Sequence, residues 1–538
     1  MRRLNARSPE IDHLPSMDSS KPQTRAISSH RLSFSNPKSG RGNIWIFVAA
    51  VVVILAVFFY LSAVTRGSGK KGYGIVIDAG STGTRIHVFE FSMRRGLPVL
   101  KFGDGGSATM KVNPGLSDFV ADPSGAGRSI LELLKFGKGR VPKEFWEETE
   151  VRLLATAGLR RLGVEIQERI LDSCRRVLRS SGFRFRDDWA SVITGSDEGI
   201  YAWVAANYAL GTLGGDPQQT TGIVELGGAS AQVTFVSSEP LPPEYSHTLK
   251  FGEFSYKLYS HSLLHLGQNV AYESLRELLI SGDMKFAAES VLEGTFIDPC
   301  TPRGYSHDME SLNLPGDSSA RSERLPSMNA RGNFSECRSA ALKLLQKGKD
   351  ECLYQNCHIG STFVPELQGK LLATENFFYT SKFFGLAPTA LLSDLTLAGQ
   401  QFCEEDWVNL KKIYHTLNDE DLMRYCFSSA YIVALLHDSL GIALNDESRI
   451  AFANQVGDIP LDWAVGAFIM QSAADSGVEH PDWVAGIVGD DSSALLSLFI
   501  VSVVLVSIAW SVSRWQKPQL KTIYDLEKGR YIVTRVNR

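Results

Sequence analysis

Two stretches decide the fold: residues 75–89 read IVIDAGSTGTRIHVF, and residues 223–235 read IVELGGASAQVTF. Each has an apolar run typical of a β-strand, an acid near its end, a turn of small and hydroxyl residues, and a second apolar run. The two acids, Asp78 and Glu225, are 147 positions apart (225 − 78), about the length of one lobe. The repeat therefore predicts two similar α/β lobes, each with one small-residue hairpin.

The composition of these turns indicates phosphate chemistry. Without large side chains, backbone N–H groups can approach an anion closely, and serine and threonine hydroxyls add further donors. An acid at the strand end repels phosphate, so it is better explained as holding a divalent cation that bridges to phosphate. Neither turn is a Walker loop, because GxxxxGK[ST] is absent and strand rather than helix follows. The alternative is two glycine-rich hairpins that only reverse the chain.

Two further segments lie between the hairpins. VRLLATAGLRRL (151–162) predicts a buried strand followed by small residues and Arg160. ITGSDEGIYAWVAANY (193–208) places Asp197 and Glu198 just before a predicted helix, where an acid often serves only as a cap.

The bulk composition excludes some classes of protein. With 538 residues the chain is too long for a single core, and 44% hydrophobic and 21% charged residues are ordinary for a globular protein. The formal net charge is only −4, from 55 basic and 59 acidic residues, which argues against a nucleic-acid-binding protein.

Two segments predict a membrane protein. Residues 44–64 and residues 494–512 carry no charge and have the length of a transmembrane helix. The alternatives are a signal peptide for the first and a buried core helix for the second. Because basic residues flank the outer ends of both, we expect two spans with both tails cytoplasmic. The block between them would then be extracellular, or in the Golgi or endosomal lumen.

The cysteines point to the same topology. All seven lie between the two spans, as does the only glycosylation sequon, at Asn333. This distribution suits disulfides in an oxidising compartment. A zinc site at Cys352 and Cys357 is the rival interpretation, but no CxxC pair or matching histidine pair accompanies it.

Six segments together resemble the conserved regions of the apyrase, or nucleoside triphosphate diphosphohydrolase, family, most closely its membrane-bound plant-type members. They occur in order between about residues 73 and 480: DAGSTGTR (78–85), ATAGLR (155–160), the GxxEGxYxWxxxNY pattern (195–208), ELGGASAQ (225–232), DLMRYCFSSAYI (421–432) and DWAVGA (462–467).

The resemblance implies an α/β fold with two RNase H-like lobes, as in the actin, Hsp70 and sugar-kinase superfamily, flanking a cleft. It also implies hydrolysis of terminal phosphates from nucleoside tri- and diphosphates, with Ca²⁺ or Mg²⁺ as cofactor. Oligomeric state stays open. We expect a disordered cytosolic tail (1–43), a transmembrane helix (44–64), a stalk (65–72), lobe I (73–208, completed near 465–485), lobe II with the disulfides (209–464), a transmembrane helix (494–512) and a cytosolic tail (513–538).

Roles follow from the same resemblance. Glu198 matches the general base, and Asp78 and Glu225 match the two acids that hold the metal through water. Thr156, Ser230 and Gln232 match polar groups that position water. The phosphate loops would be Ser81, Thr82, Gly83 and Thr84 with Gly227, Gly228, Ala229 and Ser230.

Other features are implied in the same way. Tyr379 and Tyr425 are candidates for stacking on the base, although aromatic residues in such segments serve equally well as core. Disulfides are expected for Cys352–Cys357, Cys403–Cys426 and Cys300–Cys337, whereas Cys174 is expected to be a buried free thiol.

One departure and three rival interpretations stay open. The family's fourth region usually begins with Asp, and this chain has Glu225, which puts metal geometry and the ratio of ATP to ADP hydrolysis in doubt. The rivals are a Golgi-type nucleoside diphosphatase for UDP and GDP, a kinase or exopolyphosphatase on the same scaffold, and a catalytically weak nucleotide-binding membrane protein. No Ser/His/Asp or Cys/His nucleophile set is evident, so we expect direct attack by water.

Overall fold

The computed structural model describes residues 71–94, 97–103, 106–281, 295–305, 327–354, 357–386, 388, 391–475, 520–525 and 530–535. The predicted tail 1–43 and both predicted spans, 44–64 and 494–512, lie outside these residues. Within the described part, no helix has the length and apolarity needed to cross a bilayer.

Sheet A forms the core of lobe I. Its strand order is β3-β2-β1-β5-β6, with β4 paired to β2. The hairpin β1–β2 is antiparallel, and β5 lies parallel to β1 on the other side. Ile75, Val76 and Ile77 are all buried, because both faces of β1 are covered. The strands are β1 (Lys71–Ala79), β2 (Thr84–Arg94), β3 (Leu97–Lys101), β4 (Ala108–Val112), β5 (Glu150–Ala155) and β6 (Ala190–Val192).

Sheet B forms the core of lobe II and repeats this order. It runs β16-β15-β7-β8-β10-β9, with an antiparallel hairpin β7–β8 and with β15 parallel to β7. The predicted mixed α/β fold with an internal repeat is therefore confirmed. The strands are β7 (Gly222–Leu226), β8 (Ser230–Val236), β9 (Ser246–Phe251), β10 (Phe254–Leu264), β15 (Leu371–Glu375) and β16 (Ile450–Phe452).

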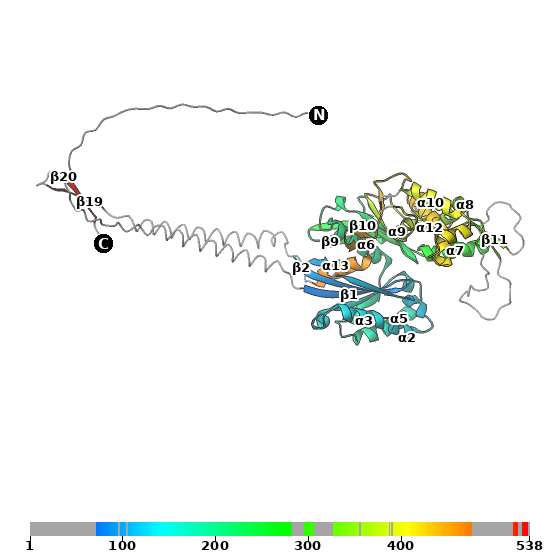
Figure 1. The fold of residues 1–538 in the computed structure, drawn as a ribbon, viewed down its shortest axis with the longest axis horizontal. Coiled ribbons are helices and arrows are strands. Elements are labelled where there is room, and N and C mark those ends of the chain that lie inside the picture. The colour runs from blue at the N-terminus through cyan, green and yellow to red at the C-terminus, as the bar shows by residue number, and fades with distance from the viewer. Residues whose placement is uncertain are drawn as a thin grey trace, which may run out of the picture. The chain divides into compact units, whose positions relative to one another are not determined.

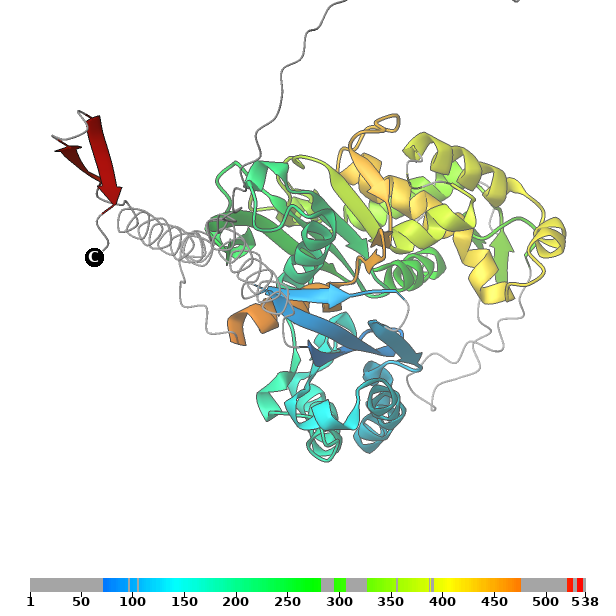
Figure 2. The same cartoon turned by 60° about the vertical axis from the view of Figure 1, so that its left-hand side comes forward.

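Two helices lie between the sheets (Figures 1 and 2). α6 (Gly195–Leu210) packs on β8 and β10 of sheet B, and α13 (Trp463–Asp475) packs on β1 and β3 of sheet A. The predicted boundary after residue 208 places α6 in lobe I, and Tyr208 of α6 does hydrogen-bond to β3 of sheet A, although most of the helix's sheet contacts are with sheet B. The two helices contact each other closely, since a Cβ at Gly466 would lie 1.8 Å from the carbonyl oxygen of Tyr201.

The outer faces of both sheets are covered by further helices. On lobe I these are α2 (Pro123–Ser129), α3 (Leu131–Arg140), α4 (Ala157–Arg160) and α5 (Val164–Arg179). On lobe II they are α7 (Gln268–Ile280), α8 (Phe334–Leu345), α9 (Asn376–Phe383), α10 (Leu392–Glu404), α11 (Trp407–Ile413) and α12 (Asp419–Val433), which continues as a π-helix over Ala434–Ser439.

Among the described residues, four small strand pairs lie outside the two large sheets. They are β11 (Thr295–Asp298) with β12 (Ser327–Ala330), β13 (Cys357–Ile359) with β14 (Thr362–Phe363), β17 (Gln455–Val456) with β18 (Ile459–Pro460), and β19 (Leu520–Asp525) with β20 (Arg530–Arg535). The last pair is an antiparallel hairpin within the predicted C-terminal tail.

The cysteine predictions are confirmed. Disulfides join Cys300 to Cys337, Cys352 to Cys357 and Cys403 to Cys426, so Cys352 and Cys357 are not free to bind zinc. Cys174 is a buried free thiol in α5, where burial raises its pKa to about 12. Such a thiol is protonated at neutral pH and chemically inert.

Candidate active site

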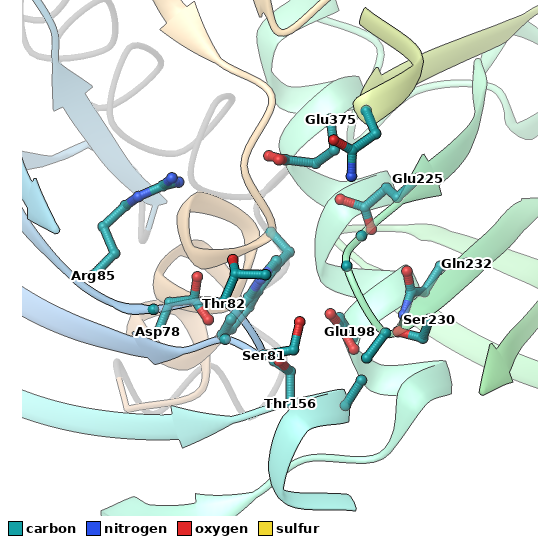
Figure 3. A pocket seen from close by; sticks show the side chains of 18 of the residues that line it. Asp78, Ser81, Thr82, Arg85, Thr156, Glu198, Glu225, Ser230, Gln232 and Glu375 are labelled. Carbon is teal, nitrogen blue, oxygen red and sulfur yellow. Dashed lines mark hydrogen bonds between the residues drawn. The ribbon is translucent and has the colours of Figure 1, made fainter. Parts of the chain in front are cut away.

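A cavity of about 420 Å³ lies between the two predicted hairpins. Figure 3 shows side chains from sheet A facing side chains from sheet B across it. Most of the residues predicted for the site line this cavity: Asp78, Ser81, Thr82, Gly83, Thr156, Glu198, Glu225, Gly227, Gly228, Ala229, Ser230, Gln232 and Tyr379. Thr84 and Tyr425 are not among the lining residues.

The two turns approach each other at a glycine of the lobe II turn, and a glycine of the lobe I turn packs closely against its own lobe. A Cβ at Gly228 would lie 2.9 Å from Ser81 Oγ and 2.9 Å from Thr82 Cγ2, so a side chain there would push the lobes apart. A Cβ at Gly83 would lie 2.9 Å from the carbonyl oxygen of Val112. Small residues thus keep the backbone of both turns accessible to an anion.

Glu198 lies in the first turn of α6 and is buried. The local sequence fixes this position, because Thr194 caps the helix by accepting a hydrogen bond from the Asp197 N–H. Arg160 Nη2 donates to Glu198 Oε2 over 2.7 Å and lies 3.4 Å from Ser230 Oγ. Burial raises the pKa of Glu198, and the Arg160 guanidinium opposes that rise.

A hydrogen-bonded chain continues from Arg160 into sheet B. Gln232 Nε2 donates to Ser230 Oγ over 2.7 Å and to Ser262 Oγ over 3.2 Å. Since the Ser230 hydroxyl accepts from Gln232, its own proton can be directed into the cavity. Glu198, Ser230 and Gln232 therefore form one polar group at one end of the cavity.

The strand-end acids carry unbalanced charge. Asp78 Oδ1 and Glu225 Oε2 are buried and have no hydrogen-bond partner among the described residues. Burial raises the pKa of both carboxyls well above its ordinary value, and neighbouring acids add to the effect, chiefly Asp462 for Asp78 and Glu198 for Glu225. Burying two such groups is unfavourable unless a cation compensates them.

This donor set fits a divalent cation held in part by water. Across the described ranges, no three His, Cys, Asp or Glu side chains converge into a closed metal site. Mg²⁺ often binds through one or two carboxylates, with waters and substrate phosphates as its other ligands. Asp78 and Glu225 supply the two carboxylates for such an arrangement.

Several cavity residues were not predicted as site residues. Arg85 and Lys111 bring positive charge from lobe I, and Asp462 Oδ2 lies 3.3 Å from Arg85 Nη1 and 3.5 Å from His87 Nε2. Burial alone would raise the pKa of Asp462, but His87 and Arg85 bring it below its ordinary value. The other unpredicted lining residues are Gly80, Ala157, Asn269, Glu375, Asn376 and Trp463.

Comparison with known proteins agrees with this geometry. Residues 65–479 match the GDA1/CD39 (nucleoside phosphatase) family. The chain belongs to this family.

Its relatives in the GDA1/CD39 family include plant and animal proteins. "Probable apyrase 6" of Arabidopsis thaliana is 55% identical over 520 residues, covering 95% of this chain and 93% of that protein. "Probable apyrase 4" of the same plant is 51% identical over 485 residues, covering 88% and 95%. "Ectonucleoside triphosphate diphosphohydrolase 5" of Ailuropoda melanoleuca is 31% identical over 429 residues, covering 77% and 90%. The predicted resemblance to apyrases is thus confirmed.

A solved structure shares the GDA1/CD39 chain's fold. A crystal structure of nucleoside triphosphate hydrolases from Neospora caninum superposes with a TM-score of 0.57 at 19% sequence identity. The match covers 81% of this chain and 99% of that one.

The two tyrosines proposed from the family resemblance have different surroundings. Tyr379, in α9, lines the cavity with 48% of its surface exposed, as a stacking residue requires. Tyr425, in α12, stacks face to face on Phe383, with ring centroids 3.5 Å apart. Phe402 and Tyr414 surround the same pair, so Tyr425 belongs to an aromatic cluster of lobe II instead of lining the cavity. Its aromatic neighbours were not evident from its position in the sequence.

Proposed function

We propose that this protein is an apyrase, which hydrolyses the terminal phosphates of nucleoside tri- and diphosphates by direct attack of water. One observation carries the proposal: two turns of the same design, one from each α/β lobe, bring Asp78 and Glu225 to a single cavity that Glu198 of α6 also lines. The relatives named apyrase and ectonucleoside triphosphate diphosphohydrolase support the choice of nucleotides as substrates.

The two turns would bind the phosphate chain. Backbone N–H groups of both turns and the hydroxyls of Ser81 and Thr82 can donate to phosphate oxygens. Arg85 and Lys111 lie on the lobe I side and add positive charge. A phosphate chain between the lobes would therefore find donors on both sides.

Asp78 and Glu225 would hold a divalent cation, Ca²⁺ or Mg²⁺, largely through water. When bound, such a cation neutralises charge on the phosphoryl group that is transferred. The unpartnered buried oxygens of both acids support this assignment. The side chain of Glu225 is one methylene longer than the family's usual Asp, which would change the position of this ligand relative to the cation.

Glu198 would act as the general base. One of its oxygens accepts from Arg160, which orients the carboxylate and favours its ionised form, and the other oxygen is left for water. Thr156, Ser230 and Gln232 would position that water beside the terminal phosphate. General-base assistance of this kind is typically worth about 10²–10⁴-fold in rate.

Phosphate release from the purified full-length protein tests the proposal. We expect hydrolysis of ATP and ADP that EDTA abolishes and that Ca²⁺ or Mg²⁺ restores. A panel with UDP and GDP distinguishes a broad apyrase from a Golgi-type nucleoside diphosphatase. Failure of the folded protein to release phosphate from any of these nucleotides, with either cation, would refute the assignment.

We also propose that the catalytic block lies outside the cytosol, in a two-pass membrane protein with both tails cytoplasmic. The three disulfides of lobe II support an oxidising compartment. Asn333 is compatible with glycosylation, because its Oδ1 caps α8 by accepting from the Glu336 N–H, and the glycan would be attached at the other atom, Nδ2. Glycosidase treatment should increase the mobility of the wild-type chain in gel electrophoresis but leave Asn333→Gln unchanged. Equal mobility of the treated and untreated wild type would count against this topology.

A further inference from the structure

Glu375 has a backbone conformation that glycine usually adopts. It ends β15 and precedes α9, with φ 58° and ψ −121°. These angles match the first central position of a type II′ turn, where glycine predominates. Among the described residues, the only other non-glycine with positive φ is His265. Because a glycine would fit here without strain, the glutamate side chain needs a reason of its own.

The Glu375 carboxylate lies in the cavity without a fixed partner. In the described part of the chain it makes no hydrogen bond or ion pair, whereas its backbone N–H donates to Asn454 Oδ1 over 2.7 Å. Burial and the Asp462 carboxylate raise the pKa of Glu375, and Arg85 and Lys111 of lobe I lower it. The backbone is thus fixed, and the carboxylate remains available as an acceptor.

Glu375 lies away from the end of the cavity that contains Glu198, the proposed general base. In Figure 3 it lies beyond Glu225, on the side away from Glu198 and Thr156. Tyr379 follows it by one turn of α9 and lines the same cavity. If the terminal phosphate lies at Glu198 and the cation lies between Asp78 and Glu225, the nucleoside extends towards Glu375 and Tyr379.

We propose that Glu375 binds the ribose hydroxyls of the substrate and so selects ribonucleotides. This inference rests on the proposed function. A carboxylate repels phosphate, but its two oxygens can accept hydrogen bonds from ribose hydroxyls, and in dinucleotide-binding folds an acid binds the ribose 2′-OH. Hydrogen bonds to an ionised acceptor are stronger than neutral ones. The sugar is therefore the part of a nucleotide that suits a carboxylate at this end of the cavity.

The test compares kcat/KM for ATP, 2′-deoxyATP and 3′-deoxyATP, using the full-length protein with saturating metal. We expect the wild type to prefer ATP over at least one deoxy analogue by about tenfold, the contribution of one hydrogen bond to a charged group. The ratio of kcat/KM for ATP to kcat/KM for the deoxy analogue should decrease in Glu375→Gln and approach unity in Glu375→Ala. In both variants the decrease should come from a lower kcat/KM for ATP. His265→Ala is the matched control, because it changes the other strained non-glycine, outside the cavity lining, and should keep the wild-type preference.

Three results would overturn the inference while leaving the proposed function intact. The first is equal kcat/KM of the wild type for all three nucleotides, a result that needs no variant to fold. The second is full wild-type preference in Glu375→Ala or Glu375→Gln. The third is a higher metal concentration for half-maximal activity in either variant with the preference unchanged, which would make Glu375 a metal ligand. Absence of hydrolysis of any nucleotide would instead refute the proposed function.

Discussion

The two predicted phosphate loops share a backbone design but differ in the charge around their acids. Beside Asp78, the Arg85 guanidinium lowers the carboxyl pKa and partly offsets burial and Asp462. Beside Glu225, after burial, the strongest influences on the pKa are Glu198, Glu375, Asp462 and Asp78, all of which raise it. The acid of the lobe I loop therefore has a cation beside it, whereas the strongest electrostatic neighbours of the lobe II acid are all acids, so the proposed metal would matter more for the lobe II loop. The two lobes therefore share a strand arrangement, but the charged groups around Asp78 and Glu225 differ.

The largest effect is expected at Glu198, which belongs to the lobe II side of this comparison. Glu198→Gln should lower kcat by at least about 100-fold, the lower end of general-base assistance, with KM for ATP little changed. Steady-state phosphate release measures both parameters. Asp197→Asn, one residue away and outside the cavity lining, should retain most of the activity. Normal turnover in a folded Glu198→Gln protein would remove this residue from the mechanism.

The cations of lobe I should affect binding more than turnover. Arg85→Gln should raise KM for ATP by about 10- to 100-fold, because a hydrogen bond to a charged group is worth roughly 1.5–3 kcal/mol. Lys101→Gln, on the surface of the same sheet, provides a control with no expected change. A lower kcat in Arg85→Gln with an unchanged KM would contradict the assignment of substrate binding to the cations of lobe I.

Shortening Glu225, the acid of the lobe II loop, tests whether the metal requirement of the activity depends mainly on this side chain. Glu225→Asp withdraws the carboxylate by one methylene, so the cation concentration for half-maximal activity should rise about tenfold. Activity measured against free Mg²⁺ and free Ca²⁺ gives this value for each metal. Glu239→Asp, at the surface of lobe II, is the control. An unchanged metal requirement would show that the length of Glu225 does not matter for the cation.

The smallest effect concerns stability without metal. Because the folded-state pKa of Glu225 is raised above its ordinary value of 4.5, the ionised group destabilises the metal-free fold at high pH. Glu225→Gln should therefore raise Tm in EDTA at pH 8, by more than Asp78→Asn does, since Arg85 partly compensates Asp78. The difference from wild type should shrink as pH falls through the folded-state pKa and vanish below about 4.5. Thermal unfolding of the three proteins across this range measures it, and a larger gain for Asp78→Asn would reverse the comparison.

The sequence predicts the parts of the site that are locally encoded. Both loops combine an apolar run, an acid and small residues within a few positions, so Asp78 and Glu225 could be recognised directly. The fold class followed from the same repeat. Glu375 could not be recognised in this way, because β15 is separated by more than 130 residues from β7, the strand it joins. Yet it ends the strand LLATE, and an acid at a strand end was already the signal used for the two loops.

Long-range packing accounts for the remaining differences. Arg85 and Asp462 both lie in quoted segments, but only the fold shows that α13 brings Asp462 to the β1–β2 hairpin. Tyr379 and Tyr425 both lie in helices, and the sequence around them does not show which of the two lines the cavity. The difference arises because Phe383 and its neighbours pack against the ring of Tyr425, a contact that no local pattern encodes.

The glycine contact between α13 and α6 has a mechanical consequence. At one end of the two-lobed block, β1 lies in sheet A. At the other end, α13 packs both on β1 and β3 of sheet A and on α6, which packs on sheet B. A pull on β1 would therefore load lobe I first, whereas a pull on α13 would be shared between both lobes through the close contact at Gly466.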